Sequence, residues 1–151
     1  MISRHMKSPP PRWAYVLLSL TWGLPLTLTG ALIFAVLMLF GRRPRRFGYC
    51  YYIEIGRSWG GLELGLFFLK DERPSEVLMA HEHGHVLQNI VYGPLMPFVI
   101  TLPSAARYWY RRIVARMGRG GRLPPYNAIW FERDADALGL LMKFAQTSPF
   151  R

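Results

Sequence analysis

A run of 28 residues without a charged side chain, at positions 13–40, constrains the fold of this chain more than any other feature. A helix needs about 20 apolar residues to cross a bilayer core, so the run is long enough to span it with some tilt. It is longer than the apolar core of a cleaved signal peptide, which is about 7–15 residues. Four arginines follow directly, at positions 42–46, as in a stop-transfer anchor. We predict a retained transmembrane helix over residues 13–40, after a basic N-terminal tail at 1–12.

The distribution of charge indicates both an orientation and a partner. Three basic residues precede the run and five follow it closely, so the positive-inside rule favours a single-pass protein with a cytoplasmic C-terminal domain. The formal net charge of +10 alone would suggest nucleic acid. However, the charge is concentrated in residues 1–46 and 93–125, which contain no acid and flank apolar stretches. That arrangement favours a lipid bilayer with anionic head groups as the partner, and nucleic acid is not favoured.

A second apolar stretch, at residues 94–106, is too short to span a bilayer. Three placements are open: a helix in the membrane interface, a shallow re-entrant segment, or a core helix. The arginines and aromatic residues at 107–112 could stack on nucleic acid bases. Beside a membrane anchor, the same composition is typical of a segment that contacts head groups.

The remaining residues, 47–146, predict one small domain. Aromatic and β-branched residues at 48–56 and the apolar run at 62–69 indicate a β-hairpin. Three helices are expected, at about 75–92 with Ser75 as N-cap, at 95–117 with a bend at Pro103, and at 126–146. The predicted fold class is an α+β membrane protein with an N-terminal transmembrane helix, a β-hairpin, and three helices that carry a zincin-like HExxH and ExxAD site.

The first of these three helices contains the sequence His-Glu-His-Gly-His at positions 81–85, which satisfies the HExxH pattern. Residues four apart lie on one helical face, so the imidazoles of His81 and His85 can reach one metal ion. Glu82 can reach a water molecule beside that ion without being a ligand. Zinc is the default ion for a site of this kind, and we expect one per chain. His83 points away from His81, at about 200° around the helix. Gly84 suggests a close approach of another segment, for which the strand at 62–69 is the obvious candidate.

A catalytic zinc site needs a third protein ligand, and the last helix offers one. Glu132 and Asp136 are four residues apart and therefore share one face of that helix. One carboxylate can bind the metal, and the other can hydrogen-bond a ligand imidazole and select its tautomer.

These motifs resemble those of the gluzincin clan of zinc metallopeptidases. The resemblance implies that His81, His85 and Glu132 hold the ion, that Glu82 is the general base, and that Asp136 supports a metal-binding histidine. The chain is also similar to small bacterial membrane proteins with an H-E-x-G-H motif. It departs from the thermolysin-like members at Phe131, where they carry Asn, and no second zincin subdomain is visible in the sequence.

We therefore expect a membrane-anchored zinc metallopeptidase that hydrolyses peptide bonds through a zinc-activated water. Four side chains are possible donors to the oxyanion, and the sequence does not rank them: Tyr126, Arg133, Tyr92 and His83. One alternative is a zinc-stabilised membrane protein or adaptor without peptidase activity. The other is a basic membrane-surface or nucleic-acid-binding protein in which the motif occurs by chance.

Overall fold

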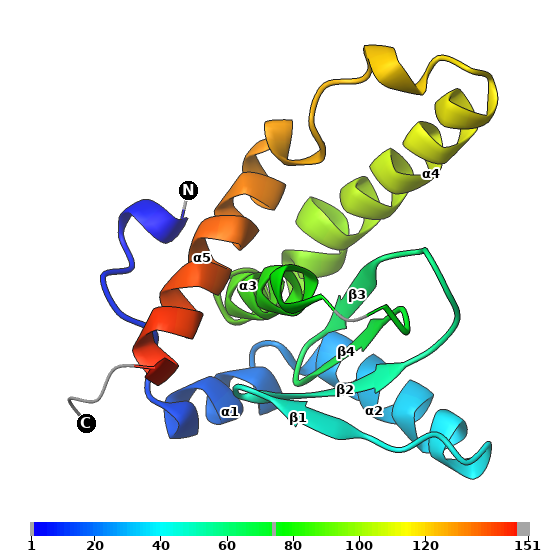
Figure 1. Cartoon of the computed structure of the whole chain (residues 1–151). Helices are drawn as coiled ribbons and strands as arrows, with labels where there is room; N and C mark the ends of the chain where they lie inside the picture. The colour runs from blue at the N-terminus through cyan, green and yellow to red at the C-terminus, as the bar shows by residue number, and fades with distance from the viewer. Residues whose placement is uncertain (1, 74, 148–151) are drawn as a thin grey trace.

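Four short strands form one mixed sheet at the centre of the molecule (Figure 1). The computed structural model of the chain describes residues 2–73 and 75–147. Its strands are β1 (Arg45–Phe47), β2 (Cys50–Glu54), β3 (Gly61–Leu64) and β4 (Phe67–Lys70). They lie in the order β1-β2-β4-β3, with β2 and β4 parallel and the other two pairs antiparallel. Strand β3 is therefore at one edge of the sheet.

The single hairpin expected from residues 48–56 and 62–69 is wrong. The second run is itself a hairpin, because Gly65 has a φ of +73° and reverses the chain between β3 and β4. Strand β4 then pairs with β2 in parallel, and another turn, at Gly48 with a φ of +56°, joins β1 to β2. A lone glycine in a leucine- and phenylalanine-rich run gave too little signal for a turn to be predicted there.

The predicted N-terminal transmembrane helix, and with it the predicted α+β membrane fold, is wrong. The apolar run forms two helices, α1 (Arg12–Leu20) and α2 (Leu24–Leu39), inclined at 88° to each other. Over the described residues, no single helix is both long and apolar enough to cross a membrane. Two pairs of consecutive helices reach that length and hydropathy when their members are taken together, and both pairs are sharply bent. They are α1 with α2, and Glu76–Leu95 with Pro97–Arg116, which meet at 116°. The chain is instead a small mixed α/β fold.

Local chemistry explains the break in the apolar run. Pro25 occupies the first turn of α2, where its missing N–H and fixed φ suit the start of a helix but not its interior. Gly23 precedes it, and a Cβ at this position would collide with the amide of Asn89. The chain thus bends at a point where its backbone lies against another helix.

The N-terminal segment is part of the fold and is not a separate tail. The backbone N–H groups of Ile2 and Ser3 donate to the carboxylate of Asp134, at 3.1 and 3.0 Å, and the Ser3 hydroxyl donates to it as well. Ile2 and Met6 pack against the core. Figure 1 shows this end of the chain beside the last helix.

Three longer helices follow the sheet: α3 (Glu76–Tyr92), α4 (Leu102–Arg116) and α5 (Trp130–Thr147). The predicted N-cap is confirmed, because the Ser75 hydroxyl accepts a hydrogen bond from Leu78 N at 3.1 Å. The bend predicted at Pro103 lies earlier in the chain. A 3-10 turn (Gly93–Leu95) and a short π-helix (Pro97–Thr101) precede α4, and Pro103 lies in the first turn of α4, where an N–H is not needed.

The two faces of the sheet pack on different helices. On one face, the stacked rings of Tyr52 and Phe68 belong to a core cluster with Val86 and Leu87 of α3. On the other face, Ile53 and its neighbour Leu69 belong to a cluster with residues of α2. The sheet is therefore enclosed between α2 and α3 (Figure 1). In the second apolar stretch, Met96 and Ile100 are buried in the same cluster as α2, whereas Phe98 is exposed.

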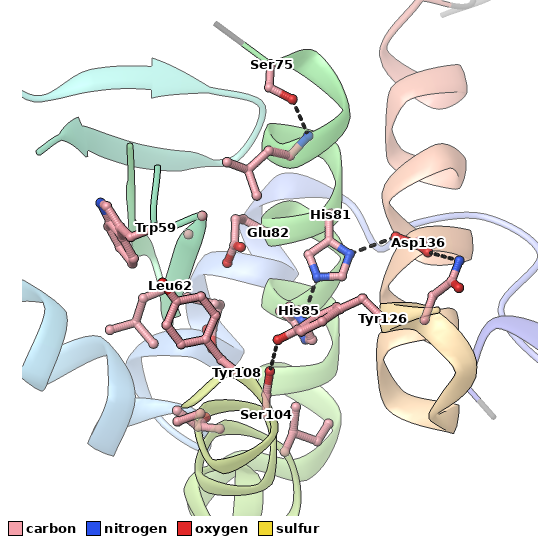
Figure 2. Close-up of a pocket in the computed structure, with 18 of the residues that line it drawn as sticks. Trp59, Leu62, Ser75, His81, Glu82, His85, Ser104, Tyr108, Tyr126 and Asp136 are labelled. Carbon is pink, nitrogen blue, oxygen red and sulfur yellow. Dashed lines mark hydrogen bonds and ion pairs between the residues drawn. The ribbon is translucent and has the colours of Figure 1, made fainter. Parts of the chain in front are cut away.

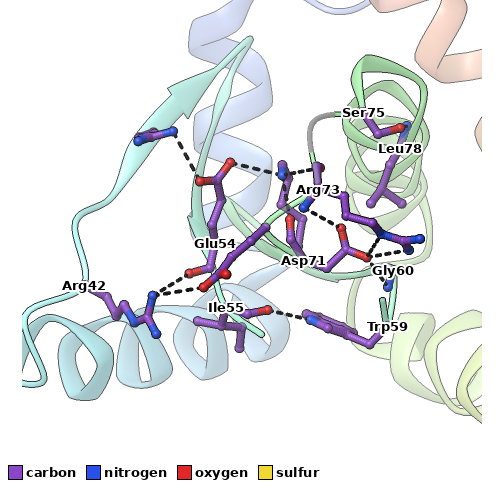
Figure 3. Close-up of polar contacts among 12 residues, drawn as sticks. Arg42, Glu54, Ile55, Trp59, Gly60, Asp71, Arg73, Ser75 and Leu78 are labelled. Atoms are coloured by element: carbon purple, nitrogen blue, oxygen red, sulfur yellow. Dashed lines mark hydrogen bonds and ion pairs between the residues drawn. The ribbon is translucent and has the colours of Figure 1, made fainter. Parts of the chain in front are cut away.

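A polar network fixes the end of α2 and the loop after β4 (Figure 3). Arg42 pairs with Glu72 at 3.4 Å, and the buried Lys70 pairs with Glu54 at 3.1 Å. Asp71 accepts hydrogen bonds from Arg73 and from the backbone N–H of Gly60. At least one of the arginines expected to stop translocation is thus paired within the fold.

Candidate metal centre

Close packing of α3 against α5 brings the two halves of the site together. A Cβ at Gly84 would collide with the backbone of Ala135, and one at Gly139 would collide with the backbone of Ala80. The neighbour that requires glycine at position 84 is therefore α5, and the expectation that it is the strand at 62–69 is wrong. The pair of glycines lets the helices approach closely enough for side chains of α5 to reach those of α3.

Three potential ligand atoms form a compact triangle between these helices. Nε2 of His81 lies 3.1 Å from Nε2 of His85 and 3.1 Å from Oε2 of Glu132. The third side, from His85 Nε2 to Glu132 Oε2, is 3.4 Å. Ligands at 2.0–2.1 Å around a tetrahedral ion lie about 3.3 Å apart. This His81, His85 and Glu132 group can therefore hold a metal ion.

Hydrogen bonds on the far side of each imidazole orient the triangle. Nδ1 of His81 lies 2.7 Å from Oδ1 of Asp136 (Figure 2). Nδ1 of His85 lies 2.7 Å from Oε1 of Gln88. The side-chain amide of Gln88 donates to the backbone oxygen of Phe131 at 2.8 Å, which leaves its oxygen facing His85. Both imidazoles therefore donate from Nδ1 and direct Nε2 towards the centre of the triangle.

This arrangement concentrates electron pairs at one buried point. Oε2 of Glu132 is buried, and apart from the two imidazoles of the triangle no described residue offers it a hydrogen bond. A proton on His81 can satisfy only one of the two acceptors that face it, whereas a cation satisfies all three atoms. Burial lowers the pKa of His81, but hydrogen bonds to Asp136 and Glu132 outweigh this and raise it to about 10. The site thus favours positive charge strongly.

A pocket of about 920 Å³ opens beside the triangle (Figure 2). Glu82 lines it, and burial raises the pKa of this carboxyl. Strand β3 passes directly alongside, since a Cβ at Gly61 would collide with the Glu82 carboxyl group. The other walls are largely apolar and include Trp59, whose indole N–H is held by the backbone oxygen of Ile55 at 2.7 Å.

Of the four proposed oxyanion donors, only Tyr126 is among the described residues that line this pocket. Its hydroxyl lies 3.2 Å from that of Ser104, and burial raises its pKa. His83 is buried elsewhere and accepts a hydrogen bond from the backbone of the β1–β2 turn. Tyr92 packs near Trp130, and Arg133 donates to a backbone oxygen.

Sequence reasoning missed three residues at the site. Gln88 orients His85, and its position three residues later on the same helical face was a usable signal. Ser104 donates a hydrogen bond to Oε1 of Glu132, and with Thr101 it is one of two hydroxyl residues in a largely apolar stretch. Glu63 is buried in the pocket wall, where burial raises its pKa, and nothing in the strand pattern marked it.

No family model, curated protein or solved structure matches this chain. The resemblance to gluzincins therefore depends on the motifs alone, and the metal centre must be judged by its own geometry.

Proposed function

We propose that this chain is a zinc-dependent peptidase of gluzincin type. The observation that carries the proposal is the triangle of two Nε2 atoms and one carboxylate oxygen, with both imidazoles oriented from behind. Two histidines and one carboxylate are a common ligand set of catalytic zinc, and three protein ligands leave one coordination position for a reactant. Zinc, when bound, supplies a Lewis acid that activates water and polarises a carbonyl group.

The residues around the triangle fit hydrolysis of an amide bond. Glu82 is buried beside the ligands, and its raised pKa suits a group that accepts a proton from the attacking water and delivers it to the leaving amine. The hydroxyl of Tyr126 faces the same pocket and can donate to a developing oxyanion. The largely apolar walls favour peptide segments with apolar side chains.

Metal analysis and one isosteric substitution test this function. We expect purified protein to contain about one zinc per chain, and we expect His81→Ala combined with His85→Ala to abolish it. Glu82→Gln should retain zinc but lose hydrolysis of a library of internally quenched peptides, by at least about 100-fold, since it removes the general base. Inductively coupled plasma mass spectrometry and fluorescence report the two quantities.

The outcomes separate a catalytic metal from a purely structural one. Native protein without metal would refute the zinc site itself. Protein that binds zinc but cleaves no peptide, or a Glu82→Gln variant with full activity, would refute the peptidase while the metal centre remained.

A further inference from the structure

The outer face of α2 is as apolar as its buried face. Leu26, Gly30 and Phe34 face the sheet and are buried, as is usual for the inner face of a helix that packs on a sheet. On the opposite side, Leu28, Leu32 and Val36 are 53%, 62% and 52% exposed. A helix that is apolar all round is normally surrounded by other apolar groups. Among the described residues, the fold covers only one side of α2, so its other side needs an apolar environment that these residues do not provide.

The exposed threonine hydroxyl groups at the end of α1 and in α2 have hydrogen-bond partners within the chain and do not need water as an acceptor. Thr21 donates from its hydroxyl to the backbone oxygen of Leu17 at 2.8 Å, and Thr29 donates to that of Pro25 at 2.8 Å. Such bonds to the preceding turn satisfy the hydroxyl donors within the helix. In hydrocarbon, every polar hydrogen needs a partner of this kind. The polar residues on this surface are therefore compatible with an environment that contains no water.

The two apolar stretches of the sequence meet at their bends. The indole N–H of Trp22, in the bend between α1 and α2, donates to the backbone oxygen of Val91 at 3.3 Å. A Cβ at Gly93 would collide with the same indole. Exposed apolar side chains of both stretches adjoin this contact in the sequence, and the outer face of α2 continues them. We call this set the apolar belt: Leu20, Trp22, Leu24, Leu28, Leu32, Val36, Val91, Leu95 and Phe98.

Charge favours one kind of partner for the apolar belt. Residues 1–46, which form most of it, contain seven basic side chains and no acid, and the whole chain carries a formal +10. Exposed aromatic rings lie at both ends of the bent pair, at Trp13 and Phe40. Arginines and aromatic rings at the border of an apolar surface are typical of contact with anionic head groups. A second copy of this chain would bring the same positive charge and would be repelled.

We infer that the apolar belt inserts into one leaflet of an anionic bilayer and holds the molecule on the membrane surface without spanning it. Helix α2 contains 16 residues, and at 1.5 Å per residue it is about 24 Å long, shorter than the hydrocarbon core of about 30 Å. The 88° bend also prevents α1 from extending it. This inference is independent of the proposed peptidase, because none of the metal ligands belongs to the belt.

Vesicle binding of the full chain tests the inference. We expect the protein to sediment with vesicles of mixed phosphatidylcholine and phosphatidylglycerol, and to do so more weakly with phosphatidylcholine alone. Changing Leu28, Leu32 and Val36 together to Gln should weaken binding about 100-fold, because three side chains no longer enter hydrocarbon. All three are exposed and lie outside the core clusters, so the fold should persist, as circular dichroism can verify.

A matched control changes Ile113 and Leu140 to Gln, two exposed apolar residues outside the belt, and should bind vesicles like the wild type. Equal binding by the triple variant, or no binding by the wild type, would overturn the inference. If the wild type does not bind vesicles but self-associates, and the triple variant does not self-associate, the belt would instead be an interface with a second copy. Equal binding to both kinds of vesicle would overturn the role of anionic head groups. Zinc content should be the same in all variants, so failure of the belt is distinguishable from failure of the metal centre.

Discussion

At the scale of single residues, the metal centre depends on side chains that never touch the ion. Gln88 and Asp136 each hold one imidazole through Nδ1 at 2.7 Å. The Asp136 carboxylate accepts a hydrogen bond from the side-chain amide of Asn127 at 3.1 Å. The side-chain amide of Gln88 donates to the backbone of α5 at Phe131. Such outer partners fix the tautomer and orientation of a ligand histidine, and they raise its affinity for metal.

Replacing Gln88 with Ala should weaken zinc binding by about 10- to 100-fold, because His85 loses the acceptor that orients it. Competition with a chromophoric zinc chelator at neutral pH measures the change. Asn89→Ala is the control, since it removes the adjacent buried amide, which faces Gly23 and not the ligands. It should lower stability and leave the zinc affinity unchanged. Equal losses of affinity in both variants would show that Gln88 acts only through the stability of α3.

At the scale of elements, the crossing of α3 and α5 brings the site together. Two of the ligands belong to α3 and the third to α5, so the ligand triangle exists only while the two backbones stay in contact. Gly84 and Gly139 make that contact possible, each lying against the backbone of the opposite helix. Protein interiors are close-packed, so an added methyl group here must displace one helix.

Gly84→Ala should therefore destabilise the fold by about 1–3 kcal/mol or more and also reduce zinc binding, because it moves Glu132 away from the histidines. Urea denaturation and zinc titration measure the two effects. Gly121→Ala is the matched control, since a Cβ there meets open space and the change should alter stability by less than about 0.5 kcal/mol. A Gly84→Ala variant with full zinc affinity would contradict the role given to this helix contact.

At the scale of the whole molecule, stability should depend on pH through a histidine that is not a metal ligand. His83 is buried between α3 and the β1–β2 turn, with its ring 5.7 Å from that of Phe47 and 5.9 Å from that of Tyr49. Burial lowers the pKa of His83 from 6.5 to about 4. The unfolded chain thus binds a proton below about pH 6.5, and the folded chain binds it only near pH 4.

The free energy of unfolding should consequently fall as the pH is lowered from 6.5 to 4, with His83 contributing a loss of about 3 kcal/mol at most. Urea denaturation in the presence of a chelator, so that metal occupancy does not vary, measures this for the wild type and for His83→Gln. The variant keeps an acceptor for the backbone of Tyr49 but cannot be protonated. Its stability should decline less over this pH range, and parallel profiles for the two proteins would contradict the assignment.

Much of the site was predictable from the sequence because it is local. His81 and His85 share a helical face through their spacing alone, and Ser75 and Gly93 mark the ends of that helix in the sequence. The spacing of Glu132 and Asp136 likewise places both on one face of α5. These properties depend on backbone geometry within a few residues, so no knowledge of the fold was needed to state them.

The remaining features of the fold and the site depend on contacts between segments that are distant in the sequence. Hydropathy over residues 13–40 reflects the environment that the side chains prefer. Pro25 favours a helix start locally, but the contacts of Gly23 and Trp22 with α3, which hold the bend in place, are long-range. The distance from Glu132 to the histidines depends on the crossing of α3 and α5, which Gly84 and Gly139 permit. Each of these glycines lies more than 40 positions in the sequence from the backbone that it contacts. Residue types and spacing alone identify side chains that can hold a metal ion. Only the fold brought them within reach, because long-range contacts depend on the packing of whole elements and not on residue spacing.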